Sequence, residues 1–437
     1  MPDRSICLPT NENFSMSQIV ALADASRDDR LYSDGDFRRQ SIDGELIARV
    51  ERYRLERLRQ QMRHHEMDAV ILFDPINIRY ACGSRNMQVY SQRNPARYLY
   101  VPLEGPVVLF EFSACLHLAK GSQLLDEVRP ARAVMPQYSG PHCARHTANF
   151  VDDIRALFER SMTQGKRLGI ESAPTAAVSA LDEAGFELMD AAVVMEGAKS
   201  IKSIDELSLI HRSVTLTESA MARMEASLRP GMSENELWSI FNQHVLATGG
   251  EYAETRLLTS GARTNPWFQE CSDKIIAPGE LVAFDTDIVG CFGYYTDFSR
   301  TFHVPGRGGP TQEQRRLYRM AADQLESNIA LLEPGMSFRE YSRRAWPIPQ
   351  GYRENRYLDI VHGCGMTGEW PLIAHDMDWD DVGYDGHLEP GMTLCVEAYI
   401  GHRDGSEGVK LEEQVLITER GIDRLSTYGY DEELLGS

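Results

Sequence analysis

The sequence lacks any stretch that would place the chain in or across a membrane. No run of about 18 apolar residues occurs in its 437 residues. The N-terminus, MPDRSICLPTNENFSMSQ, has no basic segment followed by an apolar one, as a secretory signal would. The eight cysteines are scattered without CxxC spacing, which excludes a zinc knuckle or a disulfide framework. We therefore expect reduced thiols in a cytoplasmic protein.

Positive charge is also scarce. The chain has 45 Lys and Arg against 65 Asp and Glu, a formal charge of -20. This balance repels phosphate backbones and anionic lipid surfaces and favours cations, so we expect no nucleic-acid or membrane partner. A hydrophobic content of 42% is enough for a sizeable core in two or three domains.

The pattern along the chain predicts an arm and two domains. Residues 1–45 are polar and irregular, which predicts an arm that wraps another surface. Residues 46–200 predict an α/β domain, with a helix in ELIARVERYRLERLRQQMRHHEMD and a hairpin around Gly105. Within it, AVILFDPINIRYACG predicts a buried strand, a proline turn and a second short strand.

Residues 201–437 predict a second domain of helices followed by antiparallel strands. Two helices begin with capping boxes, at Ser203 with Glu206 and at Ser233 with Glu236. Five strands are predicted after them: RLLTSG, LVAFDTDIVG, YYTDFSRTFHV, GMTLCVEAYIG and EGVKLEEQVLITERG. This order is typical of an α+β layer with one face of the sheet covered.

The segment AFDTDIVGCFGYYTDFSRTFHV places three aspartates in an apolar run. A two-residue period puts Asp285 and Asp287 on one face of a strand, and Asp297 returns on the next strand. Buried like charges are costly unless a cation neutralises them. Taken alone, the aspartates equally fit an exposed strand end or acids paired with an arginine such as Arg300.

Three further ligand-type residues follow: His362 in VHGCG, Glu397 in CVEAYIG and Glu412 in VKLEEQVLITERG. Both glutamates lie in predicted strands rather than on a solvated helix. Oxygen-rich side chains with one imidazole suit a pair of divalent ions such as manganese, iron, cobalt or zinc.

Over residues 50–437 these features resemble the pita-bread family of creatinase, prolidase, aminopeptidase P and methionine aminopeptidase. The ligand order and the words SRTF, GCG, PGM and VLITERG carry the resemblance. It implies a two-domain α+β fold, with a creatinase-type N-terminal domain at 46–200 and a pita-bread catalytic domain at 201–437. It also implies a homodimer in which the N-terminal arm and domain cover the partner's site.

Two positions depart from the peptidases of this family. Those enzymes carry a histidine in the loop before the aspartate strand, where this chain has Trp267 in TNPWFQEC. They carry another seven residues after the metal histidine, where this chain has Glu369. Losing such hydrogen-bond donors costs about 3 kcal/mol each in comparable sites, so Xaa-Pro peptidase activity is disfavoured.

The sequence is more similar to the dimethylsulfoniopropionate lyases on this fold, through FDPINIRYACGSRNMQVY, TNPWFQEC, AFDTD, HGCG and EWP. The resemblance implies removal of the proton beside the carboxylate of a small zwitterion and release of dimethyl sulfide and acrylate. Aromatic residues could surround the sulfonium by cation–π attraction, or simply pack in the core. These candidate substrate-binding residues are Tyr90, Tyr357, Trp267 and Trp370. The implied ligands of the metal pair are Asp285, Asp287, Asp297, His362, Glu397 and Glu412.

The position of the catalytic base leaves the reaction open. The lyases have an aspartate six residues after the metal histidine, where this chain has Gly368. Glu369 is the adjacent acid and the first candidate for the base, and Tyr357 is the next. The alternatives are a metallohydrolase of a C–N bond in a small zwitterion or dipeptide, and a silent binding module. The complete ligand set argues against the silent module.

Overall fold

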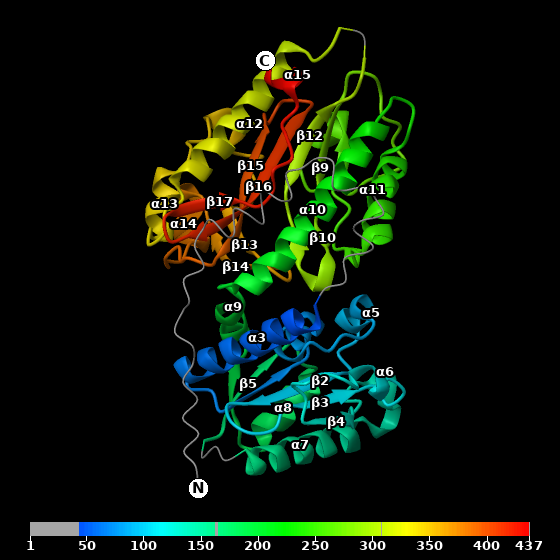
Figure 1. Ribbon diagram of the computed structural model, residues 1–437, viewed down its shortest axis with the longest axis vertical. Helices are drawn as coiled ribbons and strands as arrows, with labels where there is room; N and C mark the ends of the chain where they lie inside the picture. Colours follow the sequence, from blue (N-terminus) through cyan, green and yellow to red (C-terminus); the bar gives the residue numbers. More distant parts are fainter. Residues whose placement is uncertain (1–42, 162–164, 307, 437) are drawn as a thin grey trace. The chain divides into compact units, whose positions relative to one another are not determined.

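The computed structural model describes residues 43–161, 165–306 and 308–436 (Figure 1). The predicted arm at residues 1–45 therefore lies almost wholly outside the described residues. Among the helices of the described ranges, none is long and apolar enough to span a bilayer.

A six-stranded mixed sheet organises the first half, in the order β4-β3-β2-β1-β5-β6. β1 pairs antiparallel with β2 and parallel with β5. Aromatic and aliphatic side chains of α7 and α8 pack on one face of this sheet and close its core. The strands are β1 (Ala69–Leu72), β2 (Tyr98–Pro102), β3 (Val108–Glu111), β4 (Glu127–Pro130), β5 (Arg167–Glu171) and β6 (Glu187–Asp190). The helices are α3 (Gly44–His64), α4 (Pro75–Cys82), α5 (Gln88–Arg93), α6 (Pro136–Ser139), α7 (Cys143–Arg160), α8 (Thr175–Glu183) and α9 (Ala192–Lys199).

Two local predictions in this half have different outcomes. The hairpin at Gly105 is confirmed, because β2 and β3 pair antiparallel around it. The second short strand in AVILFDPINIRYACG is wrong, because that segment is the helix α4. Asp74 caps it by accepting hydrogen bonds from the N–H groups of Ile76 and Asn77, and Pro75 fits its first turn.

The second half begins with two long helices, α10 (Ile204–Ser227) and α11 (Glu234–Thr248). Both predicted capping boxes are confirmed, with each serine accepting from the N–H of its glutamate and each glutamate accepting in return. α11 ends at Gly249, whose φ of 106° is left-handed and so favours glycine.

Antiparallel sheets follow these helices and hold the candidate site. A five-stranded sheet has the order β14-β13-β15-β16-β17, and smaller sheets have the orders β12-β9-β8 and β11-β10-β7. α12 packs on β15 and β16, and β16 also packs against β9 and β12 (Figure 1). Apolar side chains fill the space between α12 and the five-stranded sheet. The strands are β7 (Tyr252–Ala253), β8 (Leu258–Ser260), β9 (Leu281–Asp285), β10 (Ile288–Val289), β11 (Tyr295–Thr296), β12 (Ser299–His303), β13 (Val361–Cys364), β14 (Gly368–Ile373), β15 (Thr393–Gly401), β16 (Gly408–Thr418) and β17 (Gly421–Arg424). The helices are α12 (Gln312–Leu331), α13 (Phe338–Arg344), α14 (Trp379–Val382) and α15 (Glu432–Leu435).

Candidate metal centre

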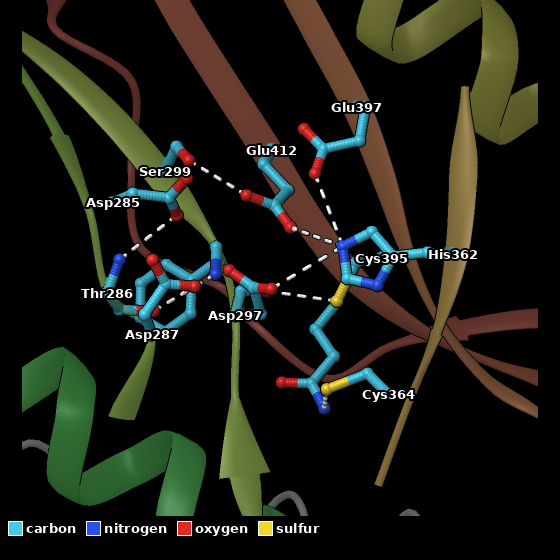
Figure 2. Close-up of polar contacts among 12 residues, drawn as sticks. Asp285, Thr286, Asp287, Asp297, Ser299, His362, Cys364, Cys395, Glu397 and Glu412 are labelled. Carbon is cyan, nitrogen blue, oxygen red and sulfur yellow. Dashed lines mark hydrogen bonds and ion pairs between the residues drawn. The ribbon is translucent and has the colours of Figure 1, made fainter. Parts of the chain in front are cut away.

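The six predicted ligands come from separate strands that the sheets bring side by side. Asp285 ends β9 and Asp297 precedes β12, which pairs with β9. His362 lies on β13, and Glu397 of β15 is directly opposite Glu412 of β16. Figure 2 shows these side chains turned toward one another.

Asp287 lies beside the other ligands because of a backbone conformation that the sequence did not predict. We expected Asp285 and Asp287 on one face of a single strand, but β9 ends at Asp285. Asp287 follows in a left-handed kink with a φ of 41°. Its carboxylate accepts a hydrogen bond from the Tyr295 hydroxyl at 2.6 Å and another from the Thr255 hydroxyl. The kink, rather than strand alternation, makes Asp287 converge with Asp285.

His362 sits among three of the carboxylates. Its Nε2 lies 3.4 Å from Glu397 Oε1, 3.5 Å from Asp297 Oδ2 and 3.8 Å from Glu412 Oε1. Potential ligand atoms of Asp285, Asp287 and Asp297 also lie within 4.8 Å of one another. The geometry thus contains two ligand groups that share Asp297.

A buried lysine binds one carboxylate oxygen of each of the two glutamates, Glu397 and Glu412. Lys410 is fully buried, and its Nζ lies 2.5 Å from Glu397 Oε2 and 2.8 Å from Glu412 Oε2. Ser299 also donates to Glu412 Oε2 at 2.8 Å. Within the described ranges, the other oxygens, Oε1 of both glutamates and Oδ1 of Asp297, are buried without a hydrogen-bond partner. Buried carboxylate oxygens in this state are what a cation would satisfy.

The net negative charge of the predicted ligands also favours a bound cation. Five carboxylates and the Lys410 ammonium leave a formal charge of about −4, which two divalent cations would balance with His362 neutral. Burial, followed by the charge of Asp285, raises the pKa of Asp287 to about 6. Burial and neighbouring acids likewise raise the pKa of Asp297 and Glu412 well above the ordinary range. These donors fit a divalent metal, whose charge would hold the acids ionised.

Arg300 does not neutralise the aspartates, although the sequence left that alternative open. Its guanidinium pairs with Glu413 and donates to the carbonyl oxygens of Ser299 and Glu412, both at 2.8 Å. The basic residue beside the ligands is Lys410, which also lies 3.5 Å from Asp285 Oδ2.

Positions 368 and 369 face different neighbours. A Cβ added at Gly368 would lie 3.9 Å from His362 Nδ1, so this position faces His362. Glu369 Oε2 instead pairs with Lys202 Nζ at 2.8 Å, and its Oε1 accepts from the N–H of Met366 at 2.8 Å. Both oxygens of Glu369 are therefore engaged away from the ligand group.

The predicted aromatic residues divide into two sets. Tyr357 is at the centre, because Lys410 Nζ lies 4.5 Å from its ring centroid. Trp267 packs in the same cluster, and its buried Nε1 has no hydrogen-bond partner among the described residues. Tyr90 is exposed and bonds to the Tyr138 hydroxyl, whereas Trp370 packs on Phe338. No described contact brings Tyr90 or Trp370 to the ligands.

Sequence reasoning missed three buried residues beside the ligands. Lys410 and Cys395 each lie two residues before a ligand glutamate on a strand, and that spacing could have placed them on the ligand face. Asp359, three residues before His362, is buried with an Oδ1 that has no partner in the described ranges. Burial raises its pKa to about 7, against the opposing effect of His362. No pattern in the sequence distinguished it.

Comparison with known proteins agrees with this architecture. Residues 208–419 match Metallopeptidase family M24, and residues 54–201 match the Creatinase/Prolidase N-terminal domain. The prolidase structure from Pyrococcus horikoshii OT3 covers 86% of this chain and 99% of its own, with a TM-score of 0.70 and 22% identity. This likeness concerns the fold alone.

Curated relatives are more similar in sequence. Dimethylsulfoniopropionate lyase DddP of Roseovarius nubinhibens is 34% identical over 395 residues, covering 89% of this chain and 88% of that protein. The DddP of Roseobacter denitrificans is 33% identical with the same coverage. The Xaa-Pro dipeptidase of Pyrococcus furiosus is 25% identical over 85% of this chain. The chain therefore belongs to metallopeptidase family M24, in the form that carries a creatinase/prolidase N-terminal domain.

Proposed function

We propose that this protein is a dinuclear-metal lyase that cleaves the C–S bond of dimethylsulfoniopropionate or a close zwitterionic analogue. The observation that carries the proposal is the joint presence of the ligand group and of Trp267 and Glu369 at the two positions where peptidases have histidines. The 34% identity to DddP supports the same reading. Bound ions would supply charge to hold the substrate carboxylate and acidify its α-C–H.

The reaction balances without an oxidant or a further reactant. A base takes the α-proton, the C–H electrons form the double bond of acrylate, and the C–S electrons leave with dimethyl sulfide. Tyr357 and Trp267 offer aromatic faces for a sulfonium, which attracts π-systems. The indole N–H of Trp267, which has no partner within the described ranges, could donate to an anionic oxygen.

The base is the open part of this mechanism. Glu369 was the first candidate from sequence, but Lys202 and Met366 hold both of its oxygens. Asp359 is the stronger candidate, because it is buried, interacts electrostatically with His362, and has an Oδ1 without a hydrogen-bond partner among the described residues. Its pKa of about 7 suits proton transfer near neutral pH.

A second candidate function is hydrolysis of a C–N bond in a small zwitterion or dipeptide. Gly368 favours it, because the position facing His362 carries no acid in this chain. The two reactions differ in their products, which are dimethyl sulfide and acrylate in one case and an amine or amino acid in the other.

The deciding assay offers metal-loaded protein dimethylsulfoniopropionate and Xaa-Pro dipeptides in parallel, with gas chromatography and mass spectrometry of the products. We expect dimethyl sulfide. Asp359→Asn should lower its release about 10²- to 10⁴-fold, and Glu369→Gln should not, if Asp359 is the base. The reverse result would return the role to Glu369. Release of amine alone would replace the lyase with the hydrolase, and a gain of dimethyl sulfide only in Gly368→Asp would also reject the lyase.

We propose further that the protein is a cytoplasmic homodimer. Phe268 and Leu358, near Tyr357, are 54% and 65% exposed, and a second copy covering them would enclose the substrate. A monomer in light scattering at working concentration would contradict the dimer.

A further inference from the structure

A cysteine thiol lies inside one of the two ligand groups. Sγ of Cys395 and ligand atoms of Asp297, His362 and Glu412 all lie within 4.8 Å of one another. Figure 2 shows the sulfur beside Asp297 and the His362 ring. The pairing of β13 with β15 causes this placement, because Cys395 is directly opposite His362.

The contacts of the Cys395 sulfur are weak ones. The side chain is fully buried, its thiol donates to the Asp297 carbonyl at a long 3.4 Å, and it also interacts with the neighbouring Cys364 thiol. Asp297 Oδ1 and Glu412 Oε1, in the same group, are buried and have no hydrogen-bond partner in the part of the chain described. One sulfur, one imidazole and two carboxylates that each have an oxygen without a described hydrogen-bond partner therefore converge on a single position.

The second ligand group has a different chemistry. Asp285, Asp287 and Asp297 offer only oxygen. Oxygen-only groups suit hard ions such as manganese, whereas sulfur and imidazole select borderline and thiophilic ions. The two proposed metal positions thus differ in the softness of their ligand atoms.

We propose that Cys395 is a sulfur ligand of the ion held by Asp297, His362 and Glu412, and that this position selects thiophilic divalent ions such as zinc, cobalt or cadmium. On binding, a sulfur–metal bond forms and the thiol proton leaves to solvent, with no change of oxidation state. The inference rests on the proposed metal centre and is independent of whether the reaction is a lyase or a hydrolase.

Cys364 provides a matched control. It is equally buried and lies on the neighbouring strand β13. Its sulfur accepts from Gln414 Nε2 at 3.2 Å and lies 3.8 Å from the Tyr295 carbonyl, outside the ligand group. Cys364→Ser therefore removes the thiol beside Cys395 and leaves the proposed ligand in place.

The test compares cobalt-loaded wild type, Cys364→Ser and Cys395→Ser by absorption spectroscopy and elemental analysis. We expect a near-ultraviolet sulfur-to-cobalt charge-transfer band in the first two proteins and its loss in Cys395→Ser. Visible cobalt bands should remain in all three. In competition experiments, Cys395→Ser should weaken cadmium binding by about tenfold or more and leave manganese binding nearly unchanged.

X-ray absorption of the zinc-loaded wild type tests the inference without any variant. A sulfur neighbour at about 2.3 Å supports it, and a shell of only oxygen and nitrogen at about 2.0–2.2 Å overturns it. Visible cobalt bands in the wild type without the charge-transfer band also overturn it, while the metal centre stands. If the protein binds no metal at all, both the metal centre and the Cys395 ligand are rejected. A charge-transfer band in a protein that releases no dimethyl sulfide rejects the lyase alone.

Discussion

Glu369 and Glu412 are buried acids on the same five-stranded sheet, yet their surroundings are opposite. Glu369 pairs with the cation Lys202, and both of its oxygens accept a bond. Glu412 shares the cation Lys410 with Glu397 and Asp285, and one of its oxygens has no hydrogen-bond partner among the described residues.

Two other buried acids of the described chain follow the pattern of Glu369. Glu111 pairs with Arg97 at 2.9 Å, and Glu206 pairs with Arg54 at 3.2 Å, with both members of each pair buried. In each of these pairs the fold supplies its own cation. The excess of acid around Glu412 is a negative charge that a bound cation could balance.

The largest effect is expected when Glu412 changes. Glu412→Gln removes a charged ligand, so metal content should fall and activity should drop by at least about 10²-fold. Elemental analysis and product release measure both quantities. Glu413→Gln is the control, because the neighbouring residue pairs with Arg300 and should keep wild-type metal. A folded Glu412→Gln protein with full metal content would contradict the ligand assignment.

The next effect concerns stability at the Glu369 pair. Lys202→Met leaves a buried carboxylate uncompensated, and we expect a loss of about 3–5 kcal/mol in the free energy of unfolding by urea. Lys202→Met with Glu369→Met should restore most of it, and metal content should not change.

An exposed ion pair provides the comparison for that loss. Glu340 and Arg344 lie 2.9 Å apart with side chains 54% and 45% exposed. Glu340→Gln should therefore change stability by less than about 1 kcal/mol. A Lys202→Met effect as small as this would show that Glu369 and Lys202 form no structural pair.

The last prediction is a dependence of stability on pH at Glu171. Burial, and then the charge of Asp74, raises the pKa of Glu171 from 4.5 to about 8. The folded state keeps a proton on the Glu171 carboxyl that the unfolded chain loses. The contribution of this group to the free energy of unfolding is therefore complete at low pH and is lost as the pH rises to about 8. Glu171→Gln should become more stable relative to wild type as the pH rises. Melting temperatures from about pH 5 to about pH 8.5 measure this difference, and a constant difference would contradict it.

Local signals predicted much of the fold. The capping boxes at Ser203 and Ser233 and the hairpin at Gly105 each depend on a few neighbouring residues, which the sequence shows directly. α4 was missed because its apolar run fits a strand equally well. Only the cap at Asp74, visible in the structure, decides between the two.

Prediction of the site was more uneven. The ligand order placed Glu397 and Glu412 on strands, where the structure has them. The kink at Asp287 follows from its left-handed φ, and the position of Asp359 follows from tertiary packing, so neither has a local signal. Lys410 was overlooked because a lysine between apolar residues ordinarily suggests a solvated side chain.

A side chain added at position 368 and the side chain of Glu369 would face different neighbours. A substitution at 368 can therefore change the site without breaking the buried ion pair of Glu369. Position 369 is constrained by Lys202, whereas a new Cβ at 368 would meet only His362 Nδ1, at an ordinary contact distance. A single codon change at 368 can therefore add or remove a side chain facing the centre without disturbing the buried pair beside it. Descendants of one ancestor can diverge in substrate at this residue while every other part of the fold stays under unchanged selection.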